Sequence, residues 1–415
     1  MKISGKYLLV LISMCGLLAS GVGLVTNVSG LFFSPIAEEF GILKGEASLM
    51  LTICNLAFAT GGLLSPRLTS EKLFRPLLIG ATAVLATSTA AFSLCNNIML
   101  MYALSVTRGL AAGAIGFVFA TSVLNRWFVA NIGLATSIAM GCSGIAGAAF
   151  SPLIGGIIAS AGWRMGFLVI AALTIALNLP AILFLPALDP STKGMRALGA
   201  AESTSTSGQN SSSQETSIKA AQDSPTPIKP VLFVAVIAFA FLASALTALP
   251  QHFPGLTESY ALDAAVGATM LSACMVANTV GKILLGVLID RFGGRASLLL
   301  YALIVAGALA LLFFVATPQV LPVAAALYGC CYAMAAVGNT MITRDAFGVG
   351  NYAKTYPVVS LMGNVANAAF SSIIGFMYDF SGGYRSTLIM FGAMSAALAA
   401  LILFVYAQRG TVRQA

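Results

Sequence analysis

Charged residues are scarce in this sequence. Only 8% of its 415 residues are Asp, Glu, Lys or Arg, against about 25% in soluble domains, and 59% are apolar, against about 45–50%. So few charges cannot cover the surface of a water-soluble chain of this length. The composition therefore excludes a soluble globular protein and indicates a membrane protein.

Histidine and regularly spaced cysteine are also lacking. The chain has one histidine, and its seven cysteines show none of the spacings typical of a zinc site or a disulfide framework. No nucleophile, base and orienting group can be assembled into a catalytic set. No Lys/Arg-rich stretch with interleaved aromatic residues suggests nucleic-acid binding. We therefore expect no cofactor, no metal, no enzymatic activity and no nucleic-acid partner.

Long apolar runs are what the sequence has instead. A helix needs about 20 residues to cross the ~30 Å hydrocarbon core of a bilayer. The first run also resembles a cleaved signal peptide, but the repeat described next requires it as a span. We predict an all-α membrane protein with twelve transmembrane helices, near residues 7–31, 45–65, 76–95, 98–124, 131–160, 164–187, 231–253, 265–288, 297–317, 319–342, 355–379 and 384–407.

The second half of the chain repeats the first. Residues 33–78 align with residues 253–298 without insertion, so that Met50 and Leu51 match Met270 and Leu271. Such a repeat is typical of secondary transporters, whose substrate site lies between two pseudo-symmetric halves. We predict six-helix bundles over residues 1–188 and 230–415 and, because residues 189–229 are rich in Ser, Thr and Gln, a flexible linker between them. We expect a monomer in the lipid bilayer.

The basic residues predict the orientation. Loops on the side of the two termini contain sixteen Lys and Arg residues, and the opposite loops contain three, Lys44, Arg164 and Arg385. Because basic loops stay in the cytoplasm, both termini are expected there, with the protein in the plasma (inner) membrane. Sixteen plus three leaves two of the 21 basic residues, and these two, Arg108 and Lys282, fall inside predicted spans.

Arg108 and Lys282 have no acidic partner at the same depth. All thirteen Asp and Glu residues fall at span ends, in loops or in the linker. A charge at the bilayer centre costs at least about 2.5–3.5 kcal/mol, so it must face a cavity or a partner. A negatively charged substrate would supply the missing counter-ion. The structural alternative for Arg108 is a bond to carbonyl groups of a neighbouring helix interrupted by glycine.

Two segments resemble a known family. The segment 286–295, with Asp290, Arg291 and Arg295, is similar to the signature loop of the major facilitator superfamily, which implies that family's twelve-helix fold. The segment 278–290 resembles span 8 of monocarboxylate transporters and the oxalate:formate exchanger, in which a basic residue eight positions before the motif Asp binds the substrate carboxylate. The resemblance assigns this role to Lys282. The exchanger's second cation, in span 11, has no counterpart within residues 357–363.

The signature loop also suggests a gate. A carboxylate at a span end complements the partial positive charge of an adjacent helix N-terminus, and arginines can pair across the two halves. The alternative is membrane anchoring by the basic residues, with a tight turn at Gly293 and Gly294. We predict a latch that holds the cytoplasmic side closed, made of Asp290, Arg291, Arg295, Gly286, Arg75 and Arg344.

Together these features predict a secondary active transporter of a small organic anion, a mono- or dicarboxylate, working by alternating access as an exchanger or a proton symporter. One alternative is efflux of hydrophobic, drug-like compounds. A second is a membrane receptor that binds its ligand without transporting it. Beside Lys282 and Arg108, the residues expected to line the central site are Asn278, Tyr328, Tyr332, Asn27 and Asn364.

Overall fold

The computed structural model describes residues 5–128, 132–185, 187–193, 195–198 and 229–412. Within these ranges the chain is helical, apart from turns, loops and one isolated bridge between Phe128 and Leu198. Ten helices are long and apolar enough to cross a membrane, and two of them reverse direction, at Gly162 and Gly293. Ten plus two gives twelve spans, as predicted.

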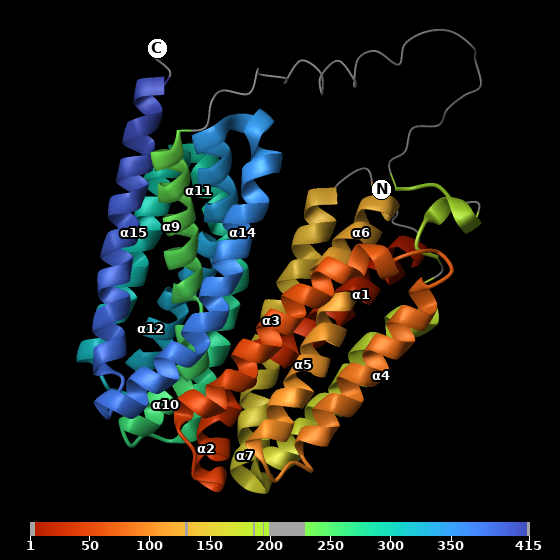
Figure 1. Ribbon diagram of the computed structural model, residues 1–415, viewed down its shortest axis with the longest axis horizontal. Helices are drawn as coiled ribbons and strands as arrows, with labels where there is room; N and C mark the ends of the chain where they lie inside the picture. Colours follow the sequence, from red (N-terminus) through yellow and green to blue (C-terminus); the bar gives the residue numbers. More distant parts are fainter. Residues whose placement is uncertain (1–4, 129–131, 186, 194, 199–228, 413–415) are drawn as a thin grey trace.

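Each half supplies six spans. The spans of each half lie together as one bundle (Figure 1). The first half contains α1 (Gly5–Leu18), η1 (Ala19–Asn27), η2 (Ser29–Phe32), α2 (Phe33–Phe40), α3 (Lys44–Leu68), α4 (Phe74–Phe92), α5 (Ile98–Ala114), α6 (Phe117–Trp127) and α7 (Ile132–Phe184). The second contains α9 (Pro230–Leu246), η4 (Leu249–His252), α10 (Phe253–Ser259), α11 (Ala264–Phe314), α12 (Val320–Tyr328), α13 (Cys330–Ala333), η5 (Met334–Gly338), α14 (Asn339–Ser381) and α15 (Arg385–Val412).

Four spans are interrupted, and they occupy equivalent places in the two halves. The first and seventh break before α2 and α10, which begin at the repeat-related residues Phe33 and Phe253. The fourth breaks between α5 and α6, and the tenth between α12 and η5. Pro250 explains one break, because proline cannot donate the next helical hydrogen bond. Broken helices of this kind commonly surround the substrate site of a transporter.

The reversal inside α11 depends on Gly293. Its backbone has φ 79° and ψ 160°, a region in which other residues are strained. This single non-helical residue reverses the direction of the chain, which then continues as the next span. The tight turn predicted at Gly293 is thus present, and Gly162 makes the same turn in α7, with φ 81° and ψ 164°.

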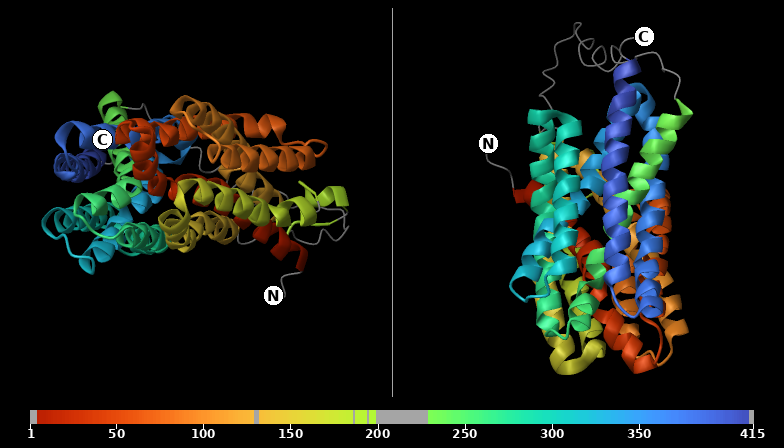
Figure 2. Two further views of the ribbon diagram at one scale, coloured as in Figure 1. Left: turned by 90° about the horizontal axis from the view of Figure 1, so that it is seen from below. Right: turned by 90° about the vertical axis from the view of Figure 1, so that its left-hand side faces the viewer.

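The two bundles touch at one end and diverge at the other (Figures 1 and 2). We call the end at α2 and α10 the contact end, and the end that carries Gly5 and Val412 the terminal end. Every hydrogen bond between described residues of different halves lies on the contact side or near mid-span, from Lys44 to Asn55 on α3 and from Ser272 to Thr279 on α11.

The start of the predicted linker packs on the first bundle. The Leu198 amide donates to the Trp127 carbonyl over 2.9 Å, and the Tyr7 hydroxyl donates to the Arg196 carbonyl over 2.7 Å. The composition of this segment did not predict these contacts. Residues 199–228, which make up most of the linker, lie outside the described residues.

Candidate functional site

A seam rich in glycine joins the two halves between α7 and α11. The Ser272 hydroxyl donates to the Ala148 carbonyl over 2.6 Å, and the Thr279 hydroxyl to the Gly141 carbonyl over 3.3 Å. A Cβ at Gly144 would overlap Thr279 Oγ1, and one at Gly147 would lie 3.0 Å from Met275 Cγ. The small residues of span 5 therefore allow the two helices to approach closely.

A second seam joins α3 and α14. The Thr52 hydroxyl donates to the Ala368 carbonyl over 2.6 Å, and Asn55 Nδ2 donates to Asn367 Oδ1 over 3.3 Å. A Cβ at Gly375 would lie 2.7 Å from Gly45 Cα. As in the first seam, the hydrogen bonds stop near mid-span.

Lys282 lies just beyond the end of the first seam. Ser272, Met275 and Thr279 contact α7, and Lys282 follows Thr279 at the helical spacing that keeps it on the same face. It stands about 4.5 Å further along the axis, by helix rise. The side chain is partly buried and forms no hydrogen bond or ion pair with any residue that the structure describes. The predicted substrate cation is thus unpaired where the halves begin to diverge.

Two predicted amide residues lie near this point. Asn278, one turn before Lys282, is 4% exposed, and its Oδ1 has no hydrogen-bond partner among the described residues. Asn364 occupies the corresponding place on the second seam, one turn beyond Ala368, and is exposed. Asn278 thus has a free acceptor where α11 meets α7, and Asn364 is open on α14.

Asn27 contributes to a polar junction at the contact side. Its Nδ2 donates to the Ser143 carbonyl over 3.0 Å, and its carbonyl accepts from Gln251 Nε2 over 3.4 Å. Gln251 Oε1 also accepts from the Gly30 amide. Sequence reasoning singled out Asn27 as a ligand contact, and the structure gives its side chain a role in helix packing in this conformation.

The two predicted tyrosines differ in their surroundings. Tyr328 is fully buried, and its hydroxyl donates to the Leu246 carbonyl of α9 over 2.8 Å. It ties two helices of one bundle together and is closed to a ligand in this conformation. Tyr332 is partly buried next to Gln251, close to the junction of the two halves.

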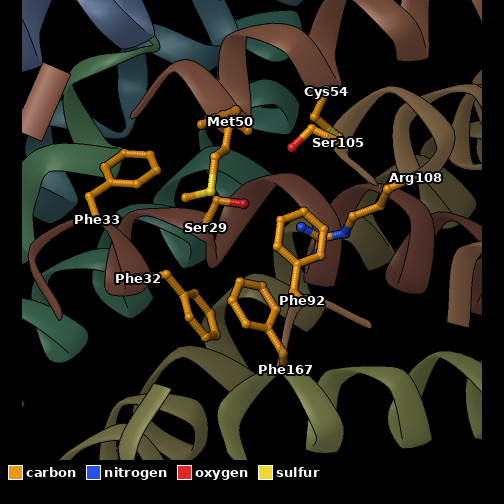
Figure 3. A pocket seen from close by; sticks show the side chains of 10 residues that line it. Ser29, Phe32, Phe33, Met50, Cys54, Phe92, Ser105, Arg108 and Phe167 are labelled. Atoms are coloured by element: carbon orange, nitrogen blue, oxygen red, sulfur yellow. The ribbon is translucent and has the colours of Figure 1, made fainter. Parts of the chain in front are cut away.

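Arg108 lies inside the first bundle and forms no ion pair with any acid that the structure describes. Its side chain is 5% exposed and points into a cavity of about 20 Å³ (Figure 3). The guanidinium carbon lies 5.6 Å from the centre of the Phe92 ring and 5.8 Å from that of Phe167. Cys54 and Ser105 also line the cavity. The two predicted cations thus occupy separate places, and the structure brings only Lys282 to the divide between the halves.

The predicted latch residues are not engaged across the halves. Asp290, Arg291, Arg295 and Arg344 are exposed at the terminal end, and neither of the two ion pairs among described residues includes them. The fifth charged member, Arg75, donates to the Leu185 carbonyl of its own bundle over 3.4 Å. A Cβ at Gly286 would meet no atom within 4 Å. This arrangement agrees with a latch that is open where the halves diverge, and the latch stays a prediction.

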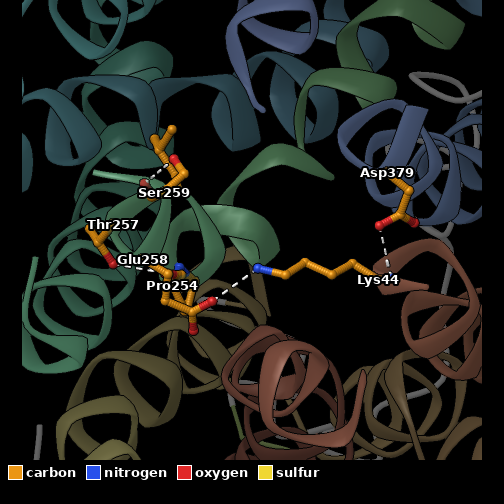
Figure 4. Close-up of polar contacts among 7 residues, drawn as sticks. Lys44, Pro254, Thr257, Glu258, Ser259 and Asp379 are labelled. Carbon is orange, nitrogen blue, oxygen red and sulfur yellow. Dashed lines mark hydrogen bonds and ion pairs between the residues drawn. The ribbon is translucent and has the colours of Figure 1, made fainter. Parts of the chain in front are cut away.

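The contact end carries a fastening that sequence reasoning missed (Figure 4). Lys44 Nζ pairs with Glu258 Oε2 at 3.0 Å. The Asp379 carboxylate accepts from the backbone amides of Lys44 and Gly45, at 3.1 and 2.7 Å, and so complements the positive N-terminus of α3. The sequence did offer one indication of this contact. Lys44 is one of three basic residues in the loops opposite the termini, and acidic residues of the other half fall in the same loops.

Comparisons with known proteins agree with this fold. The Major Facilitator Superfamily matches residues 14–254 and 231–414. The probable sulfoacetate transporter SauU of Cupriavidus necator is 24% identical over 383 residues, which cover 89% of this chain and 87% of that protein. A crystal structure of a mutant nucleoside transporter, NupG, covers 96% of this chain and all of its own at 12% identity, with a TM-score of 0.72, and has the same fold. The chain is therefore a multi-pass membrane transporter of the Major Facilitator Superfamily, and not an enzyme.

Proposed function

We propose that this transporter moves a small organic anion, a mono- or dicarboxylate, with Lys282 as the residue that holds the carboxylate. The proposal rests on Lys282, which pairs with no described residue and which helical spacing puts on the face of α11 that contacts the first half, in a chain with no acid inside its spans. A carboxylate forms a strong, charge-assisted hydrogen bond with an ammonium group, and the bond gains strength where water is scarce. Asn278 and Asn364 would position the rest of the substrate.

The similarity to SauU supports the anion class, because the substrate named for that protein is itself an organic anion. At 24% identity the substrate does not carry over. The resemblance of segment 278–290 to monocarboxylate transporters and the oxalate:formate exchanger also supports a carboxylate substrate. We propose exchange or proton symport as the mode of transport.

Alternating access would follow from the two ends of the molecule. The basic loops predict that both termini are on the cytoplasmic side of the plasma membrane. The terminal end then faces the cytoplasm, and this conformation opens inward. Rocking of the bundles would break the contact-end fastening of Lys44 and Asp379 and close the terminal end over Asp290 and the basic latch residues. Lys282 would then be exposed to each side in turn.

A counterflow screen in proteoliposomes tests the substrate class. The purified transporter is loaded with unlabelled mono- or dicarboxylate, including sulfonated acids, and uptake of the labelled compound is followed. A parallel series uses lipophilic cations. We expect saturable counterflow of at least one anion and none of the cations. Counterflow of lipophilic cations alone would contradict the proposal and favour efflux of hydrophobic compounds.

A further inference from the structure

Arg108 is a buried cation whose charge is not offset by an ion pair with any residue that the structure describes. Its Nε has no hydrogen-bond partner among the described residues, and the side chain is 95% buried. A guanidinium stays charged in proteins. Since every acid of the chain lies outside the spans, no rearrangement of the transmembrane helices alone can supply a carboxylate.

The two aromatic rings do not balance this charge. The contacts with Phe92 and Phe167, at 5.6 and 5.8 Å, are each worth about 0.5–2 kcal/mol. The penalty for an unpaired buried ion is several kcal/mol. The Ser29 and Ser105 hydroxyls of the cavity donate to the Val25 and Met101 carbonyls and carry no charge. A counter-ion must therefore come from solution.

The size of the cavity decides which anions fit. One water molecule needs about 10–15 Å³, whereas ligand pockets measure about 300–1,000 Å³. The cavity beside Arg108 measures about 20 Å³, so it accepts one occupant about as large as a water molecule. An organic acid is too large, and a water molecule fits but carries no charge.

We propose that this cavity binds a single chloride ion as the resident counter-ion of Arg108, at a site separate from the substrate site at Lys282. The cavity is lined from η2, α2, α3, α4, α5 and α7, so the ion would tie together most of the first bundle (Figure 3). A ligand that binds only the folded state stabilises it by mass action. The proposal is independent of which organic anion is transported.

Thermal unfolding of the purified full-length transporter tests the site. The unfolding midpoint is measured in sodium chloride and in sodium gluconate at equal ionic strength, over a range of chloride concentrations. We expect a saturable rise with chloride that R108Q abolishes and that K282A retains. No chloride-specific rise in the wild type, or the same rise in R108Q, would overturn the proposal.

A second measurement covers the case in which R108Q does not fold. Wild-type crystals soaked in bromide, which replaces chloride and scatters anomalously, should show a peak within hydrogen-bonding distance of the guanidinium. A bromide-soaked crystal without this peak would overturn the proposal. So would displacement of the bound halide by the transported anion in K282A, because Arg108 would then be the substrate site.

Discussion

Lys282 is a partly buried cation that forms no ion pair with any described residue. The lack of any acid in the spans marks it as an unpaired charge, and this is visible without a structure. Its place on the same helix face as Met275 and Thr279 depends on which side of α11 meets α7. Helix α11 itself has apolar side chains on every face, so the sequence pattern does not reveal which face meets α7.

Arg108 and Tyr328 show what a sequence does not reveal about single residues. They occupy equivalent positions in the repeat, and both were candidates for the central site. In the structure Arg108 is enclosed within the first bundle, and Tyr328 is enclosed within the second. A polar residue in a span looks the same in the sequence whether it faces a ligand or a neighbouring helix.

Tyr328→Phe is expected to destabilise the protein. It would leave the buried Leu246 carbonyl without its donor, at a cost of about 1–3 kcal/mol. The thermal unfolding midpoint in detergent measures this. An unfolding midpoint equal to that of the wild type would show that the bond does not stabilise the second bundle.

At the scale of helices, hydropathy predicted all twelve spans, and the glycine pair of the signature loop suggested the turn at Gly293. Hydropathy did not predict the interruptions of the first, fourth, seventh and tenth spans. The π-helical segment η1 and its neighbours have the same apolar composition as an α-helix, and only packing distinguishes them. Residues 195–198 were likewise expected to be flexible. Their contacts with Trp127 and Tyr7 join segments far apart in the sequence, so the local composition does not reveal them.

Gly144→Ala is expected to shift the conformational equilibrium. The new Cβ would overlap Thr279 on α11, and overpacking of this kind costs about 1–3 kcal/mol in the observed conformation. Because α7 and α11 separate when the contact side opens, the opposite conformation should gain population. Spin labels at positions 72 and 354, across the terminal end, would report a shorter distance.

Gly156→Ala is the matched control for that experiment. It lies on the same helix, and a Cβ there meets no atom within 4 Å. The distance distribution should therefore match that of the unsubstituted protein. If Gly144→Ala also left the distribution unchanged, the close approach of the two helices would not determine the conformation.

For the whole molecule, the main property is that the hydrogen bonds and ion pairs between described residues of the two halves lie at the contact end and near mid-span, with none at the terminal end. The contact end has the Lys44 to Glu258 ion pair and the Asp379 cap on α3. Exposed ion pairs contribute only about 0–1 kcal/mol, so we expect the cap to matter more. The sequence shows these charges at the ends of spans, but their partners depend on how the two bundles meet.

Asp379→Asn is expected to lower the population of the observed conformation about tenfold. It removes a charged acceptor of two backbone amides, and hydrogen bonds to charged groups contribute about 1.5–3 kcal/mol. The same spin-label pair measures the change. Glu38→Gln is the control, since it removes an exposed charge at the contact end that has no described partner in the other half. Equal effects of the two substitutions would show that the loss of negative charge at the contact end, and not the loss of the Asp379 cap, changes the population.

The central claim is that Lys282 holds the carboxylate of the transported anion, and counterflow tests it most directly. The best anion of the screen is compared in wild type, Lys282→Ala and Lys354→Ala, the last being an exposed lysine at the terminal end. Loss of a charge partner at a site with little water costs at least about 2 kcal/mol, or about 30-fold in affinity. We predict that loss for Lys282→Ala and wild-type behaviour for Lys354→Ala. Anion counterflow by Lys282→Ala with unchanged affinity would contradict the account.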